Sequence, residues 1–143
     1  MLSCFYSYSQ ECEYVFNDSS SVGDNIRVIS LESQEISAGF YVIFVRIDNN
    51  YFAYIEYPKE LDLSYRDIDV EVHFVDSTSV WLNNDIEEGL MNIIPLLRVE
   101  MDEYINVLAE KEVNHIVIND YRFYISYKKV FVYGLRCLIP ELH

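Results

Sequence analysis

Apolar residues in the first half of the chain follow the two-residue repeat that is typical of β-strands. The stretch Gly39–Tyr57, GFYVIFVRIDNNYFAYIEY, reads as two strands joined by a turn at Asn49–Asn50. Asparagine tolerates the positive φ that two-residue hairpin turns require. Strand Phe40–Ile47 is apolar on both faces apart from Arg46, which predicts a central strand covered on both sides. The second strand, Tyr51–Tyr57, ends at a proline, which has no N–H to donate to a ladder.

Similar patterns predict further strands on both sides of this hairpin. They are Leu2–Ser9, Cys12–Phe16, Ile26–Leu31, Ile68–Val75, His115–Asn119, Tyr121–Tyr127 and Val130–Tyr133. The clearest alternation is in Ile68–Val75, where Asp69, Glu71 and His73 share the polar face, as in a half-buried antiparallel strand. Polar segments between the strands are expected to be connections, among them Glu32–Ala38 and Asp76–Asn84. Asn119–Asp120 is expected to be a second hairpin turn.

Helical spacing appears between these two groups of strands. Asp85 is a plausible N-cap for a helix that runs to Ile94 and is stopped by Pro95. A second helix is predicted over Leu97–Val113, where apolar residues recur on one face. The chain is therefore expected to form a single α+β domain over residues 1–143. Its sheet would be mostly antiparallel, with two helices inserted between N-terminal and C-terminal strands.

Charge narrows the classes of function. The chain has 24 acidic and 10 basic residues, which gives a formal net charge of −14. This balance argues against binding nucleic acid through its phosphates and against binding anionic membrane surfaces. It favours fast, electrostatically steered association with a basic protein.

The N-terminus and the cysteines bear on location. The first residues, MLSCFYSYSQECEY, lack the basic and apolar regions of a secretory signal, so a cytoplasmic protein is expected. The longest uncharged apolar run, Gly39–Val45, is much shorter than the roughly 20 residues of a membrane-spanning helix. Cys4, Cys12 and Cys137 show no CxxC spacing, so reduced thiols are expected. A Cys4–Cys12 disulfide is the alternative if their strands pair.

Motifs for catalysis or cofactor binding are missing from the sequence. It contains no HExxH, GxSxG, GxGxxG or P-loop pattern, and no cofactor is expected. Asp69, Glu71 and His73 share one strand face, and such residues can ligate a metal or form an acid–base pair. The same three residues also fit a solvated outer strand face, which is common in a chain with 24 carboxylates.

Acidic clusters with interleaved aromatic residues are the better candidates for a functional surface. Interfaces favour aromatic anchors, with charges that steer association. The residues that we predict to bind a partner are Asp62, Asp67, Asp69, Glu71, Trp81, Glu100 and Glu103. In the competing interpretation these carboxylates are a solvated face, and nearby tyrosines such as Tyr57 and Tyr104 belong to the core.

In size, acidity and aromatic content the chain resembles bacterial toxin-immunity proteins of the contact-dependent inhibition type. The resemblance implies a cytoplasmic inhibitor that works without a cofactor. It would cover the active site of a cognate basic toxin domain, with a nuclease as the expected activity. It also implies a toxin gene beside the gene for this chain. The alternatives are a nucleic-acid mimic that blocks a DNA-binding enzyme, a small metal- or ligand-binding enzyme using Asp69, Glu71 and His73, and a subunit of a larger assembly.

Overall fold

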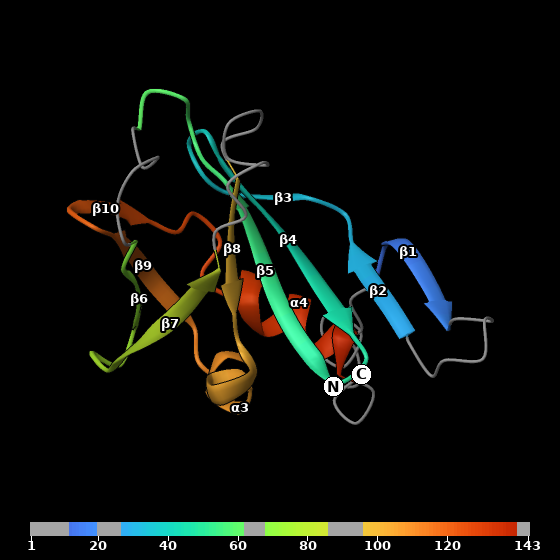
Figure 1. The fold of residues 1–143 in the computed structure, drawn as a ribbon. Helices are drawn as coiled ribbons and strands as arrows, with labels where there is room; N and C mark the ends of the chain where they lie inside the picture. The colour runs from blue at the N-terminus through green and yellow to red at the C-terminus, as the bar shows by residue number, and fades with distance from the viewer. Residues whose placement is uncertain (1–11, 20–26, 62–67, 86–95, 140–143) are drawn as a thin grey trace, which may run out of the picture.

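The computed structural model describes residues 12–19, 27–61, 68–85 and 96–139 (Figure 1). Its strands are β1 Tyr14–Ser19, β2 Arg27–Leu31, β3 Gln34–Ser37, β4 Phe40–Ile47, β5 Asn50–Glu56, β6 Val70–Phe74, β7 Ser79–Asp85, β8 Leu96–Glu100, β9 Val113–Ile118 and β10 Tyr121–Tyr124. The helical elements are η1 Asp102–Tyr104, α3 Ile105–Leu108 and α4 Val130–Leu138. The α+β class and the mostly antiparallel sheet are therefore confirmed.

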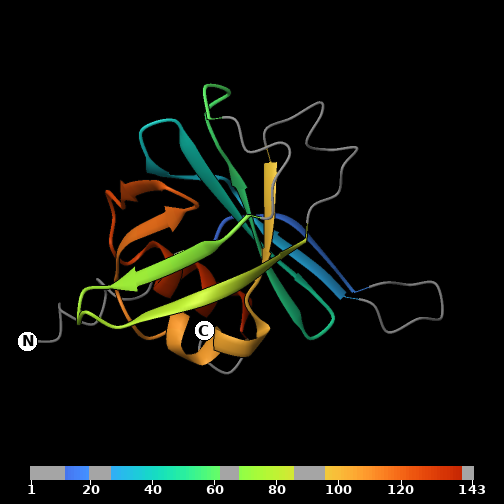
Figure 2. The same ribbon diagram turned by 60° about the vertical axis from the view of Figure 1, so that its left-hand side comes forward.

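The strands form one strongly curled sheet. Its order is β1-β2-β4-β5-β8-β7-β6-β9-β10, and β3 pairs with β4 beyond the end of β2. The Ser126 N–H donates to the Ile36 carbonyl at 2.8 Å, and the Phe40 ring stacks on Phe123 with centroids 3.9 Å apart. These contacts bring β10 and the segment after it against β4 and β3, so the sheet wraps around its own core (Figure 2).

Two hairpin turns depend on residues that tolerate positive φ. In the β4–β5 hairpin Ile47 pairs with Asn50, so the turn residues are Asp48 and Asn49, and Asp48 has φ 56°. The prediction of Asn49–Asn50 was wrong by one position, because aspartate meets the same backbone requirement as asparagine. The Asn119–Asp120 turn between β9 and β10 is confirmed by the pairing around it and by φ 53° at Asn119.

Strand β4 is central in its pairing, since it bonds to β2, β3 and β5. Its inward residues Phe40, Val42 and Phe44 are buried, whereas outward Tyr41 is 39% exposed. The expectation of cover on both faces is wrong. Outward Ile43 and Val45 are only half-buried, beside their cross-strand partners on β5, Tyr54 and Phe52.

The segment Leu97–Val113 is only in small part helical. Leu96–Glu100 forms strand β8 between β5 and β7, and α3 is confined to Ile105–Leu108. Leu97 and Val99 are both buried, so the two-residue repeat applies here rather than the helical one. The other predicted helix, which ends at Ile94, falls on residues 86–95 and lies outside the described part. Its proposed N-cap, Asp85, is the last residue of β7.

The C-terminal segment forms a buried helix where a strand was predicted over Val130–Tyr133. Helix α4 packs against β4, β2 and α3, and only Tyr133 and Arg136 among its residues are not buried. Four apolar residues cannot distinguish the two periods, and the helical repeat becomes visible only when Leu135 and Leu138 are included. Two predicted connections also contain strands, because β3 lies within 32–38 and β7 begins at Ser79.

A disulfide joins the two ends of the described chain. The sulfur atoms of Cys12, just before β1, and Cys137, in α4, are 1.99 Å apart. The expectation of reduced thiols is wrong for these two residues, and Cys4 lies outside the described part. The sequence hid the pair because 125 positions separate its members and only the docking of α4 brings them together.

Candidate functional site

The outer face of strands β6, β7 and β8 carries most of the predicted binding residues that the structure describes. Trp81 in β7 pairs with Glu71 in β6, and Asn83 in β7 pairs with Glu100 in β8. Leu82, between Trp81 and Asn83, is buried, so its two neighbours point outward. Trp81 is 57% exposed, which is unusual for so large an apolar side chain.

A small cleft opens beside this tryptophan. Its volume is about 110 Å³, and it is lined by Trp81, Asn83, Glu100, Asp102, Glu103 and Tyr104. We call these residues the acidic cleft. Element η1 supplies three of them, and β5 holds η1 in place. The Tyr51 N–H donates to the Asp102 carboxylate at 2.6 Å, and the Met101 N–H donates to the Tyr51 carbonyl at 2.9 Å.

The structure gathers some of the predicted binding residues and separates others. Trp81, Glu100 and Glu103 line the acidic cleft, and Glu71 lies next to Trp81 across the β6–β7 pairing. Asp69 is exposed and lies immediately before β6. Asp62 and Asp67 lie outside the described residues. The predicted set did not include Asn83, Asp102 and Tyr104. For Asp102 the sequence offered a signal, since it lies between Glu100 and Glu103 in the same acidic run.

Glu71 and His73 interact with each other on the outer face of β6. The Glu71 Oε1 lies 2.8 Å from the His73 Nε2, and the Ser79 hydroxyl donates to Glu71 Oε2 at 3.3 Å. The Asp69 backbone N–H donates to the Asn119 side chain at 2.8 Å. Within the described ranges, no group of three or more His, Cys, Asp or Glu side chains is placed to hold a metal ion. The metal alternative for Asp69, Glu71 and His73 therefore gains no support.

Two imidazoles stack across β6 and β9. The rings of His73 and His115 are 4.3 Å apart with an interplanar angle of 12°, and Tyr124 lies 5.2 Å from His115. The His115 Nε2 is buried and has no hydrogen-bond partner among the described residues. Burial lowers the pKa of His115 below 6.5, and the nearby charges of His73 and Arg122 lower it further.

This lowered pKa predicts a loss of stability in mild acid. The unfolded chain binds more protons than the folded one between the folded pKa of His115 and 6.5, so the free energy of unfolding falls as pH drops through that interval. In an NMR titration the His115 ring signal should have its midpoint below 6.5. His115→Gln should reduce the change in unfolding free energy between neutral and mildly acidic pH. A midpoint at or above the ordinary value would contradict this prediction.

Comparison of the chain with models of protein families, with curated proteins and with solved structures found no match. The roles of the cleft residues therefore follow from their geometry and chemistry alone. Of the helices in the described ranges, none is long and apolar enough to cross a membrane.

Proposed function

We propose that this chain is an inhibitor of the toxin-immunity type, which binds a basic protein through the acidic cleft. The observation that carries the proposal is an exposed tryptophan beside three carboxylates in one hollow. An indole face attracts a cation, and carboxylates form charge-assisted hydrogen bonds with guanidinium or ammonium groups. The cleft therefore suits a lysine or arginine side chain of the partner.

The size of the cleft supports a protein partner over a small-molecule substrate. Pockets for drug-sized ligands or cofactors occupy about 300–1,000 Å³. The acidic cleft holds about 110 Å³, which suits the end of one side chain. Outside it the surface continues through Glu71 and Asp69, so the contact would spread over β6 and β7. A buried anchor with a polar surround is the usual anatomy of a protein interface.

The charge of the whole chain favours a partner that acts on nucleic acid. A nuclease must be positive where it binds phosphates, so a molecule of net charge −14 would reach it quickly and could cover its active site. The nucleic-acid mimic is less well supported. Exposed Arg122 lies in the same cross-strand row as Glu71, and aromatic side chains interrupt the carboxylates of the cleft, so the acids do not form a regular phosphate-like array.

Two arguments about the cellular location of the protein point in different directions. The resemblance to toxin-immunity proteins implies a cytoplasmic protein. Disulfides persist in oxidising compartments and are rare in the cytosol. The Cys12–Cys137 bond therefore favours an oxidising compartment. We keep the cytoplasmic location as a prediction of the immunity hypothesis, and blocking free thiols as the cells are lysed tests it directly.

Charge reversal in the cleft tests the proposed function. The partner would be the product of the reading frame next to the gene for this chain, which the hypothesis expects to stop growth when expressed alone. Glu100→Lys with Glu103→Lys should slow association about tenfold at low salt and flatten its salt dependence.

Trp81→Ala should weaken binding by about tenfold or more, mostly through faster dissociation. Co-expression with these variants should no longer rescue growth.

A matched reversal separates the cleft from the net charge. Glu35→Lys with Glu56→Lys changes the charge by the same amount at exposed positions, and Glu56 is at the end of β5 opposite to Tyr51. This variant should keep most of the association rate and should rescue growth. Equal loss in both double variants would show that the cleft has no special role. A neighbouring protein that is harmless, or that does not bind this chain, would overturn the immunity hypothesis itself.

A further inference from the structure

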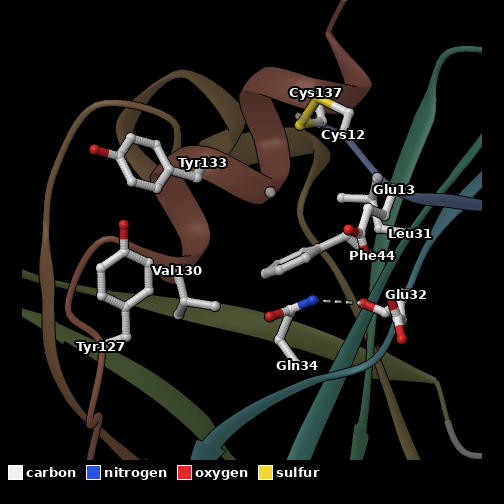
Figure 3. A pocket seen from close by; sticks show the side chains of 11 residues that line it. Cys12, Glu13, Leu31, Glu32, Gln34, Phe44, Tyr127, Val130, Tyr133 and Cys137 are labelled. Atoms are coloured by element: carbon white, nitrogen blue, oxygen red, sulfur yellow. Dashed lines mark hydrogen bonds between the residues drawn. A yellow bond between two sulfur atoms is a disulfide. The ribbon is translucent and has the colours of Figure 1, made fainter. Parts of the chain in front are cut away.

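A second and larger hollow lies between α4 and the strands β2, β3 and β4 (Figure 3). Its volume is about 220 Å³. Buried side chains form the inner part, with Phe44, Leu31 and Val130 among them, and the Cys12–Cys137 disulfide closes one side. Gly134 leaves room for the Phe44 ring, because a Cβ at this position would lie 2.5 Å from it. We call this hollow the α4 pocket.

Polar groups occupy opposite sides of the pocket (Figure 3). Glu13 and Glu32 lie together on one side, and Tyr127 and Tyr133 lie on the other. The Gln34 amide donates to the Glu32 carbonyl at 3.3 Å, which ties its side chain to the acidic side. Partial desolvation and a hydrogen bond to Tyr133 raise the pKa of Tyr127 to about 12, so its phenol is a neutral hydrogen-bonding group near pH 7.

Glu13 and Glu32 are the two carboxyl groups among the described residues that line this pocket. The Glu32 N–H donates to the Glu13 carbonyl at 3.0 Å, which keeps the two residues side by side. Hydrogen bonding with the Glu32 side chain, followed by the negative charge of Glu32, raises the pKa of Glu13. Two neighbouring carboxylates repel each other, and a cation placed between them relieves this repulsion. In the described part of the chain, no lysine, arginine or histidine lines the pocket. The acidic side is therefore complementary to a cation, and the inner part to an apolar body.

We propose that the α4 pocket binds a primary ammonium group carried on a short apolar stem. The ammonium would lie between Glu13 and Glu32, while the stem would pack against Val130 and Leu31. The volume of the α4 pocket limits the size of the ligand. A cavity of about 150 Å³ binds benzene, whereas cofactor-sized ligands need about 300 Å³ or more. A pocket of about 220 Å³ thus accepts one ring or a short chain with its amine. This site does not depend on the proposed function, since it shares no residue with the acidic cleft.

Calorimetry and NMR with matched probes test this site. Phenethylamine supplies an ammonium on a ring, and 2-phenylethanol is its neutral counterpart of nearly the same shape. The amine should bind about tenfold or more tightly than the alcohol and should shift the methyl signals of Val130. Glu13→Gln with Glu32→Gln should remove this preference. Both side chains are exposed, so the variant is expected to fold, and thermal unfolding checks that it does. Glu110→Gln, at an exposed position away from the pocket, should leave binding unchanged.

Proton release provides a second readout. Because the cation binds the deprotonated carboxylates, the affinity for phenethylamine should rise as pH increases through the raised pKa of Glu13, and binding within that pH interval should release a proton. Nα-acetyl-lysine amide distinguishes the sources of the ammonium. If it binds better than phenethylamine, the natural ligand is a lysine side chain of a protein; the reverse order assigns a free amine. Equal binding of the amine and the alcohol, or binding unaffected by the Glu13/Glu32 variant, would overturn the proposal.

Discussion

Replacing Phe44 with alanine is expected to lower the free energy of unfolding by about 3–5 kcal/mol. The Phe44 side chain is fully buried in β4, and its ring meets Phe131 of α4 edge-on with centroids 5.1 Å apart. On the same helix, Gly134 lets the backbone approach the ring closely. The residue therefore joins the sheet to α4, and truncation would leave a cavity at that junction which a rigid sheet can fill only in part.

Chemical denaturation of the wild type and two variants measures this effect. Phe52→Ala is the matched control, because Phe52 is a half-buried phenylalanine on the outer face of β5, with Arg98 5.1 Å above its ring. Its loss should be less than half that of Phe44→Ala, since it leaves no closed cavity. Similar losses in both variants would show that the contact between β4 and α4 does not organise the core.

Strands marked by a clear apolar run or by clear alternation could be located from the sequence. The bounds of Phe40–Ile47 match β4, and the inward face of Ile68–Val75 is confirmed by the burial of Val70 and Val72. In these segments the local pattern and the tertiary pairing both favour a strand, although the cover predicted for both faces of Phe40–Ile47 was wrong. The α+β class follows from the same signals, because it depends on the number and type of elements more than on their bounds.

Segments whose partners are distant could not be predicted. In β8 the apolar residues fit both periods, and the choice is made by pairing with β5 and β7 rather than by local propensity. Helix α4 packs on Phe44 through Phe131, and a disulfide links it to Cys12 near the other end of the sequence. Neither the pairing of β8 nor the contacts of α4 can be inferred from the neighbouring residues in the sequence.

The candidate site, too, could be predicted only in part from the sequence. Trp81, Glu100 and Glu103 were selected for their residue types and their place in an acidic, aromatic region. Their assembly into one cleft depends on the pairing of β7 with β8, through Asn83 and Glu100, and on η1 beside it. The sequence had assigned these segments to a loop and a helix. The residue types of the site could therefore be predicted from the sequence, but their assembly into one cleft could be seen only in the structure.

Removing the Cys12–Cys137 disulfide is expected to lower the free energy of unfolding by about 2–5 kcal/mol. The bond joins residues 125 positions apart, and a cross-link over so long a loop strongly restricts the unfolded chain. It also holds the N-terminal end of β1 against α4, where the Tyr14 hydroxyl donates to the Cys137 carbonyl at 2.8 Å. Cys12→Ala with Cys137→Ala should show this loss in denaturant titrations, and reduction of the wild type should reproduce it.

Cys4→Ala is the control for this experiment, because it removes a thiol without breaking the bond. Its stability should match that of the wild type under oxidising conditions. Thiol blocking during lysis of the source cells, followed by mass spectrometry, shows whether Cys12 and Cys137 are linked in vivo. Linked cysteines would place the protein in an oxidising compartment and contradict the cytoplasmic prediction. A double variant as stable as the wild type would mean that the docking of α4, and not the bond, holds β1 in place.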